Sequence, residues 1–243
     1  MSEAIRISEI FGPTIQGEGP LIGRPTVFIR TAGCDYRCSW CDTLYAVLPE
    51  HRHEWALMAP SDIAARVDKL AGNQPILVSL SGGNPALQPL DSVISLGLRS
   101  GHCFALETQG SVSQPWFANL DWLILSPKAP SSGMATGWAG IDACLKATAA
   151  RVRCVLKIVV FDDADYAYAR AVASRYPGLT TYLQAGNPAP LAAEESANFG
   201  PANVDDLMRR LRWLAAKAIE DQWFAATVLP QLHVLAWGNK RGV

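Results

Sequence analysis

The sequence has 243 residues with a hydrophobic content of 49%, which is enough for an α/β domain with a sizeable core. Its formal net charge of -1 excludes the strongly basic balance typical of nucleic-acid-binding proteins, so small-molecule substrates fit better. No segment approaches the ~20 apolar residues that cross a bilayer, and the first residues lack a signal-peptide pattern. We therefore expect one domain over residues 1–243, with no nucleic-acid or membrane partner and a cytoplasmic location.

The predicted elements alternate between apolar strands and amphipathic helices. A strand at residues 5–11 leads into an irregular loop rich in Gly and Pro at residues 12–20, and a strand at residues 27–30 leads to three cysteines. Residues 46–60 are expected to form a loop insertion. Further strands are predicted at residues 76–80, 103–106, 122–125, 155–161, 180–183 and 223–229. Helices are predicted from the N-cap Ser61, at residues 87–98, 139–149 and 163–175, and from the N-cap Asn203.

This alternation predicts a parallel sheet whose strands are joined by right-handed crossovers. About six strand-helix units are visible, which is fewer than the eight of a closed barrel. The expected fold class is therefore α/β, with an open or partial parallel β/α barrel. In such folds the chemistry collects at the carboxyl ends of the strands.

Three cysteines, Cys34, Cys38 and Cys41, have the spacing C-x3-C-x2-C, which can place three thiolates on one face of a loop. Iron-sulfur cubes and tetrahedral zinc usually take four protein ligands, so three without a nearby fourth indicate a cube with one open iron. Trp40 offers a flat face on which a planar ligand can lie. A zinc site with one distant ligand and three unlinked core cysteines remain the alternatives.

The other cysteines, Cys103, Cys144 and Cys154, are scattered along the chain, which fits a reducing compartment better than a set of disulfides. We expect these three to be buried small hydrophobes. His51 and His53 lie in a polar stretch and are expected in a solvated loop.

Polar or glycine residues follow several predicted strands. Gly82 and Gly83 form a turn whose exposed backbone can meet an amino or carboxylate group. Glu107 follows a buried strand, where a carboxylate is costly unless it is hydrogen-bonded, so a functional role is favoured. Lys128 follows Pro127 and places a cation at another strand end.

The cysteine spacing, with an aromatic residue before Cys41, resembles the signature of radical S-adenosylmethionine (SAM) enzymes, in which the amino and carboxylate groups of SAM chelate the open iron. The glycine turn resembles their Gly-Gly-Glu-Pro turn, with Asn84 in place of Glu. The resemblance implies a partial barrel of the radical SAM type. It also implies that SAM contacts Trp40, Cys41, Asp42, Gly83, Glu107, Ser126, Pro127, Lys128, Gln184 and Asn187.

Further motifs are similar to those of the 7-carboxy-7-deazaguanine synthase family, at residues 14–19 (TIQGEG), 28–34 (FIRTAGC), 41–43 (CDT), 126–128 (SPK) and 229–233 (LPQLH). That family converts 6-carboxy-5,6,7,8-tetrahydropterin to 7-carboxy-7-deazaguanine with loss of ammonia, on the route to queuosine and other deazapurines. The resemblance implies a [4Fe-4S] cluster on the three clustered cysteines, bound SAM, and Mg2+ on Thr43. It further implies a homodimer and an external electron donor of the flavodoxin or ferredoxin type.

A pterin presents a flat donor and acceptor edge that an amide and a carboxylate can read, and its own carboxylate suits a guanidinium. The expected substrate-binding residues are Ile15, Gln16, Gly17, Glu18, Arg30, Ser81 and His233. The terminal carboxylate of Val243 is a further candidate for a contact.

The implied mechanism begins with reductive cleavage of SAM to a 5'-deoxyadenosyl radical, which takes hydrogen from C6 of the pterin, and SAM is regenerated at each turnover. Two other functions share such a cluster. An activase of a glycyl-radical enzyme needs a groove for a protein partner, and Gln16, Glu18 and Arg30 argue against it. A small electron carrier needs only the cysteines and not the polar strand ends. Binding of SAM distinguishes the enzyme from the carrier.

Overall fold

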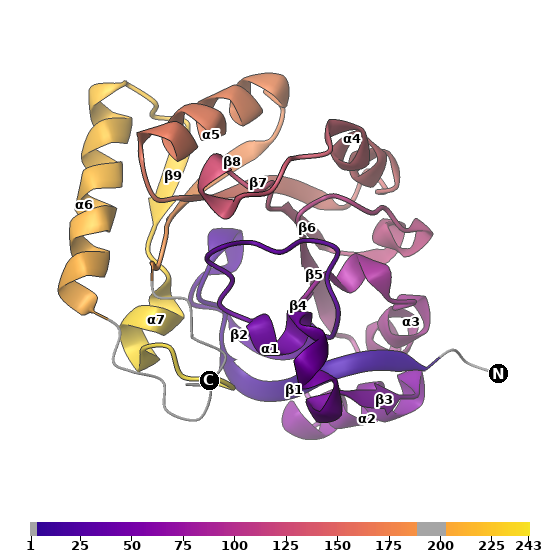
Figure 1. Ribbon diagram of the computed structural model, residues 1–243. Helices are drawn as coiled ribbons and strands as arrows, with labels where there is room; N and C mark the ends of the chain where they lie inside the picture. The colour runs from indigo at the N-terminus through magenta and orange to yellow at the C-terminus, as the bar shows by residue number, and fades with distance from the viewer. Residues whose placement is uncertain (1–3, 189–202) are drawn as a thin grey trace.

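The computed structural model of the protein describes residues 4–188 and 203–243, which form a curved sheet with helices around its outside (Figure 1). The nine strands of this described part lie in the order β3-β1-β2-β4-β5-β6-β7-β8-β9. Neighbours from β2 to β9 are parallel, whereas β1 pairs antiparallel with β2 and β3. Since β3 and β9 are the two edges, the sheet of the described residues stays open, as predicted.

The strands are β1 (Ile5–Ile15), β2 (Pro25–Thr31), β3 (Ala56–Met58), β4 (Leu77–Gly82), β5 (Cys103–Thr108), β6 (Trp122–Leu125), β7 (Arg153–Val160), β8 (Thr180–Ala185) and β9 (Ala226–Leu229). The α-helices are α1 (Leu44–Val47), α2 (Pro60–Leu70), α3 (Asp91–Arg99), α4 (Trp138–Lys146), α5 (Asp163–Arg175), α6 (Val204–Glu220) and α7 (Leu232–Trp237). Short 3-10 helices cover Gly19–Leu21, Pro49–Glu54, Pro85–Leu87, Pro115–Asn119 and Pro130–Ser132.

The N-terminal strand is longer than predicted, because a bulge keeps part of the expected loop in the sheet. The register against β2 shifts between Phe11 and Thr14, and Gly12 has a φ of +122°. A Cβ on Gly12 would lie 2.9 Å from the carbonyl oxygen of Thr26, so the bulge requires glycine. The loop insertion expected at residues 46–60 is also more regular than predicted, since it contains β3, which pairs with the start of β1.

Two helix starts differ from the prediction. Ser61 does not cap α2, because the helix begins one residue earlier at Pro60, which suits the first helical position. The helix expected at residues 87–98 is divided into a 3-10 turn and α3, since Pro89 lies between them. Asn203 caps α6 as predicted, with its side chain accepting the backbone N–H of Asp206 at 3.1 Å.

The strands place apolar side chains on the outer face of the sheet and the functional candidates on the inner face. Leu80, Leu106 and Ile158 belong to the core between sheet and helices. Side chains alternate along a strand, so residues at odd-numbered positions of β4, β5 and β7 point inward. Five inner apolar residues pack together below the carboxyl ends of the strands, namely Leu21, Leu77, Ala105, Ile124 and Val155.

Some residues lie in surroundings other than those predicted. Cys103 is exposed at the amino end of β5, so the expectation that it is buried is wrong, whereas Cys144 is buried and Cys154 half-buried. His51 is buried and its Nδ1 lies 2.7 Å from a carboxylate oxygen of Glu54, so it is not a solvated loop residue. His53 is exposed, as predicted.

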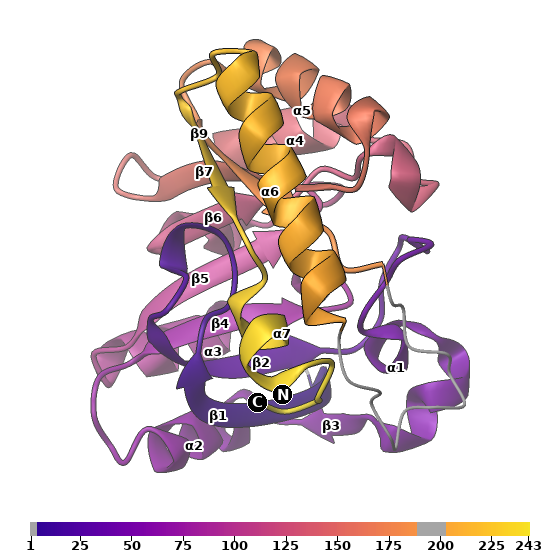
Figure 2. The same cartoon turned by 90° about the vertical axis from the view of Figure 1, so that its left-hand side faces the viewer.

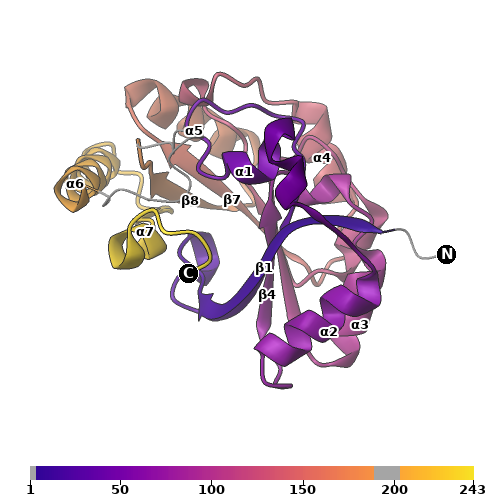
Figure 3. The same cartoon turned by 60° about the horizontal axis from the view of Figure 1, so that its bottom comes forward.

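The C-terminal segment folds back toward the start of the chain. Figures 2 and 3 show α7 and the C-terminus beside β1. The backbone N–H of Leu232 donates to the carbonyl of Gly17 at 2.9 Å, which joins α7 to the end of β1. Within residues 4–188 and 203–243, no helix combines the length and apolar character that crossing a membrane requires.

Candidate active site

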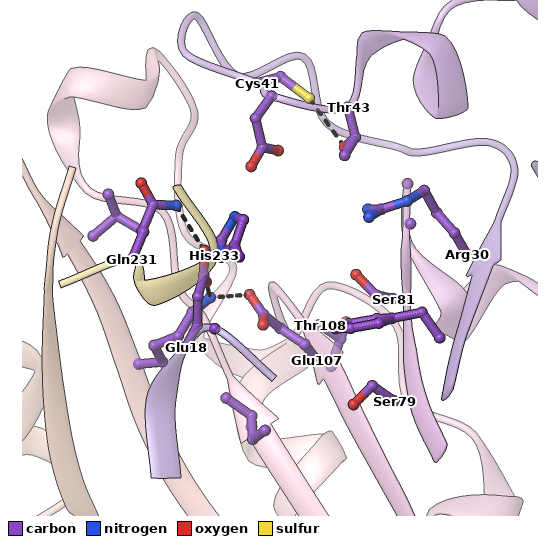
Figure 4. Close-up of a pocket in the computed structure, with 18 of the residues that line it drawn as sticks. Glu18, Arg30, Cys41, Thr43, Ser79, Ser81, Glu107, Thr108, Gln231 and His233 are labelled. Carbon is purple, nitrogen blue, oxygen red and sulfur yellow. Dashed lines mark hydrogen bonds and ion pairs between the residues drawn. The ribbon is translucent and has the colours of Figure 1, made fainter. Parts of the chain in front are cut away.

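A cavity lies at the carboxyl ends of the parallel strands (Figure 4). Inward-facing side chains of β4, β5 and β7 form one wall, and residues 33–43, here called the cysteine loop, form another. The predicted site residues that line it are Ile15, Gln16, Gly17, Glu18, Arg30, Cys34, Cys38, Trp40, Cys41, Asp42, Thr43, Ser81, Gly83, Glu107, Lys128, Asn187 and His233. Val243 lines it as well, whereas Ser126, Pro127 and Gln184 do not.

The cysteine loop presents all three of its thiols to this cavity, and none of them is in a disulfide. Cys34 Sγ accepts the backbone N–H of Tyr36 at 3.4 Å, and Cys41 Sγ lies 3.7 Å from the hydroxyl of Thr43. Burial raises the pKa of Cys34, Cys38 and Cys41, that of Cys41 to about 11. Thiolates form at such positions when a metal replaces the protons. Three convergent thiols with N–H and O–H neighbours fit the [4Fe-4S] ligand set expected from the spacing.

Trp40 is held as a flat part of the cavity wall. Its indole N–H donates to Ser131 Oγ at 2.9 Å, and its ring packs against Phe161 at 5.4 Å between centroids. Lys128 Nζ lies 5.7 Å from the Trp40 ring centroid and donates to Ser126 Oγ at 3.1 Å. Ser126 therefore does not line the cavity itself but accepts a hydrogen bond from Lys128, which does.

Gln184 lies behind the wall rather than in it. Its side chain accepts the backbone N–H of Gly19 at 3.4 Å and donates to the carbonyl of Leu229 at 3.3 Å. The amide thus joins the end of the N-terminal segment to β8 and β9, and it is fully buried. Asn187, two residues after the end of β8, does line the cavity, and its amide donates to the side chain of Asn239 at 2.7 Å.

Gly82, the last residue of β4, and Gly83, which follows it, are required by close packing on the end of β2 and the start of the cysteine loop. A Cβ on Gly82, which has a φ of +129°, would lie 2.2 Å from the carbonyl oxygen of Thr31. A Cβ on Gly83 would lie 2.1 Å from the carbonyl oxygen of Gly33. No side chain fits at either position, so the turn and the cysteine loop form one unit.

The segment that follows β1 is anchored to β4 and to α7. Gln16 is buried, its amide donates to Ser79 Oγ at 3.2 Å, and its oxygen accepts the backbone N–H of Glu18 at 3.2 Å. A Cβ on Gly17 would lie 2.1 Å from Nδ1 of His233. Glycine is therefore needed for the imidazole to approach this segment.

A buried lysine links two carboxylates of the cavity wall. Lys157 Nζ forms ion pairs with Glu18 and, at 2.5 Å, with Glu107, and its side chain is 3% exposed. Burial raises the pKa of Glu18, but its interactions with Lys157, His233 and Gln231 outweigh this and lower it to about 2. Burial disfavours the charge of Lys157, but Glu107 and Glu18 raise its pKa above the usual range. Both Glu18 and Lys157 are consequently charged at neutral pH.

Arg30 lies across the cavity from Glu18 and His233 (Figure 4). Its Nε donates to a Glu9 oxygen at 2.7 Å, and Tyr45 donates to the same oxygen at 3.0 Å. Arg241 from the C-terminal segment donates to the other oxygen of Glu9 at 3.0 Å. Of the three guanidinium nitrogens of Arg30, only Nε has a hydrogen-bond partner among the described residues. The two Nη groups are therefore available at the cavity.

The sequence prediction missed Lys157 and Gln231, which both line the cavity. Gln231 donates to the second oxygen of Glu18 at 2.6 Å, while its own Oε1 is buried without a partner in the described structure. A signal for Lys157 was present, because a lysine within an apolar strand is unusual unless it is paired. Gln231 belongs to the LPQLH motif at residues 229–233, in which the resemblance implied a substrate contact only for His233.

Glu18, Asp42 and His233 form a group whose ligand atoms lie within 4.8 Å of one another, which is a suitable distance for a cation. However, both oxygens of Glu18 already accept hydrogen bonds, one from Lys157 and one from Gln231. The negative charge of Glu18 is thus compensated by protein groups.

Comparison with known proteins identifies the family. The 7-carboxy-7-deazaguanine synthase of Bacillus subtilis (strain 168) is 42% identical over 248 residues, with both chains covered in full. That of Bacillus cereus is 41% identical over 241 residues, which cover 98% of this chain and 99% of the relative. The chain belongs to the 7-carboxy-7-deazaguanine synthase family. The family predicted from the sequence motifs is thereby confirmed, and the protein is an enzyme of the radical SAM type.

Solved structures of lower sequence identity have the same fold as this member of the 7-carboxy-7-deazaguanine synthase family. QueE from Escherichia coli has a TM-score of 0.66 at 21% identity and covers 95% of each chain. SuiB from Streptococcus suis, bound to its precursor peptide SuiA, has a TM-score of 0.57 at 11% identity and covers 83% of this chain and 47% of its own. They confirm the predicted partial barrel. No model of a protein family matches the sequence.

Proposed function

We propose that this chain converts 6-carboxy-5,6,7,8-tetrahydropterin to 7-carboxy-7-deazaguanine with loss of ammonia. The observation that carries the proposal is the arrangement of one cavity. The three cysteines of the cysteine loop line it, and Arg30 lies opposite Glu18 across it (Figure 4). This arrangement provides a cation for the carboxylate of the pterin and an anion for the donor edge of its ring.

Arg30 would pair with the carboxylate on C6 of the pterin. Because Glu9 holds Nε, the two Nη groups are oriented for a bidentate pair. Phe11 and Phe28 line the cavity beside it and stack on each other at 4.9 Å, so they offer apolar surface to a flat ring.

The opposite edge of the pterin would meet the end of β1. Glu18, kept ionised by Lys157, would accept N–H groups of the ring. Gln231, whose amide donates to an oxygen of Glu18 at 2.6 Å, would hold that carboxylate toward the ring. Ile15, Gln16, Gly17, Ser81 and His233 complete the proposed substrate site.

The cysteine loop would hold a [4Fe-4S] cluster through Cys34, Cys38 and Cys41. When bound, the cluster and SAM would supply the 5'-deoxyadenosyl radical that removes hydrogen from C6 of the substrate. The protein groups would orient SAM and exclude water. They are Trp40, Cys41, Asp42, Gly83, Glu107, Lys128 and Asn187, with Ser126, Pro127 and Gln184 as supports behind the wall.

Thr43 would hold Mg2+ at the substrate side of the cysteine loop. Its hydroxyl lies at the cavity beside Cys41 Sγ, and a hard oxygen suits magnesium. We assign the ion to Thr43 rather than to the group of Glu18, Asp42 and His233, because Glu18 already has protein partners and imidazole is a poor ligand for magnesium.

The wider setting is also part of the proposal. A flavodoxin or ferredoxin type donor would reduce the cluster, and the chain would act as a homodimer, as the family resemblance implies. The six cysteines are free, which supports a reducing compartment such as the cytoplasm.

The decisive experiment is anaerobic reconstitution with iron and sulfide, followed by incubation with dithionite, SAM, Mg2+ and 6-carboxytetrahydropterin. Mass spectrometry should show 7-carboxy-7-deazaguanine, and replacing Cys34, Cys38 or Cys41 with Ala should abolish both cluster and product. Cys103→Ala is the control, since that thiol is exposed and outside the cavity. Reconstituted protein that binds SAM but leaves the pterin unchanged would disprove the assigned substrate.

A further inference from the structure

Asn84, which follows the glycine turn, has a side chain in which every polar group is used. It is fully buried, its Oδ1 accepts from the hydroxyl of Thr108 at 2.9 Å and from the N–H of Ala86 at 3.2 Å. Its Nδ2 donates to Asp35 Oδ1 at 2.9 Å and to Ser111 Oγ at 3.1 Å. The backbone N–H of Ala86 can only donate and the carboxylate of Asp35 can only accept, so the amide has a single consistent orientation.

Asp35 belongs to the cysteine loop and directly follows Cys34. The side chain of Gln109 reaches the same place, with Nε2 lying 2.7 Å from Asp35 Oδ1 and 3.8 Å from Cys34 Sγ. One carboxylate oxygen therefore accepts from two side-chain amides, which come from the ends of β4 and β5. Hydrogen bonds to a charged acceptor are stronger than those between neutral groups.

The backbone of Asn84 makes a second connection to the same loop. Its N–H donates to the carbonyl of Gly33 at 2.8 Å, and the N–H of Gly83 donates to Thr31 at 3.1 Å. The residue thus holds the loop on both sides of Cys34, through Gly33 before it and Asp35 after it.

We propose that Asn84 is a positioning residue for the cluster ligand Cys34, and that an amide rather than a carboxylate stands here because the loop presents the carboxylate of Asp35. A carboxylate at residue 84 would place two anions 2.9 Å apart, one of them fully buried. The resembled turn has Glu at this position, whereas here the amide of Asn84 donates to Asp35. This inference rests on the proposed cluster ligation and is independent of the substrate.

The pairing predicts rescue by exchanging the two groups. Asn84→Asp is nearly isosteric and should make loss of iron to a chelator roughly tenfold faster than in the wild type, as expected when a charge-assisted hydrogen bond is lost. Asp35→Asn in addition should recover part of the wild-type rate, because the new amide at residue 35 can donate to the new carboxylate at residue 84 once Gln109, which donates to Asp35 in the wild type, turns its oxygen toward that amide. The EPR signal of the reduced cluster and its change on adding SAM should follow the same pattern.

The experiment uses the reconstituted 243-residue chain without pterin. Gln114→Glu is the control, because that half-buried amide donates to the carbonyl of Ala86 and lies outside the cavity. Thermal unfolding of the metal-free variants tests whether each variant folds. If Asn84→Asp does not fold, Asp35→Asn alone should still accelerate iron loss, because it removes the carboxylate that Asn84 donates to. Wild-type retention of iron in Asn84→Asp, or an exchange variant no better than Asn84→Asp, overturns the inference. Failure of the wild type itself to bind a cluster would instead refute the proposed function.

Discussion

Replacing Lys157 with Met removes the cation that two half-buried carboxylates share and keeps a side chain of similar length. Lys157 is 3% exposed and Glu18 is 14% exposed, so solvent screens their interaction only weakly. Glu18 and Glu107 would then face each other without the intervening charge. We expect the variant to fold with reduced stability and to bind the pterin less well.

The size of the effect follows from the pKa of Glu18, which falls from 4.5 to about 2 in the folded protein. That depression corresponds to about 3 kcal/mol of stability. Since the folded-state pKa is the lower one, this contribution is complete above about pH 4.5 and is lost as the pH falls through about 2. At pH 7 the wild type retains all of it. Lys157 is the largest of the groups that lower this pKa, so Lys157→Met should lose most of the contribution, about 2 to 3 kcal/mol, in line with the destabilisation expected when one partner of a buried ion pair is removed.

The assay is urea unfolding of metal-free protein at pH 7. Lys146→Met is the control, because that lysine is exposed and should change the free energy of unfolding by less than about 0.5 kcal/mol. Adding Glu18→Gln to Lys157→Met should recover part of the loss, since the uncompensated charge of Glu18 disappears. If Lys157→Met unfolds with the same free energy as the wild type, the ion pairs contribute no net stability and the reasoning is refuted.

Three further changes test the substrate side of the cavity. Arg30→Ala should weaken binding of the carboxypterin at least about tenfold in a fluorescence titration, while SAM affinity is unchanged. Arg30→Lys should not restore binding, because the bidentate pair is lost. If Arg30→Ala binds the carboxypterin like the wild type, Arg30 is only a structural partner of Glu9. Thr43→Ala should raise the Mg2+ concentration needed for half-maximal turnover, whereas activity that survives thorough chelation in the wild type would remove magnesium from the mechanism. Gly17→Ala should displace His233, whose Nδ1 would lie 2.1 Å from the new Cβ, and raise KM with the iron content unchanged. Gly178→Ala, with no atom within 4 Å of the new Cβ, is its control, and equal KM values in the two variants would argue against a role for the imidazole.

The local features of this protein could be predicted from the sequence. The three cysteines of the cysteine loop lie within eight consecutive residues, so their spacing alone predicts convergence on one metal group. The strand and helix patterns have periods of about two and 3.6 residues, which are also local, and they predicted the open parallel sheet. The bulge at Gly12 was missed because it depends on the partner strand, where Thr26 leaves no room for a Cβ.

The ion pairs at the cavity and beside it could not be predicted, since each joins distant parts of the chain. Glu18 and Lys157 are 139 residues apart, and Glu9 and Arg241 are 232 residues apart. Nor did the glycine turn show why Asn84 replaces Glu, because its partner Asp35 lies on a different loop. Alternation along a strand tells which side chains share a face, but packing of the helices decides which face becomes the core and which the cavity. Lys157 could therefore be noticed in the sequence as an unusual residue of an apolar strand. Its two carboxylate partners could not, because Glu107 comes from β5 and Glu18 from the segment after β1, and only the folded sheet brings them to the lysine.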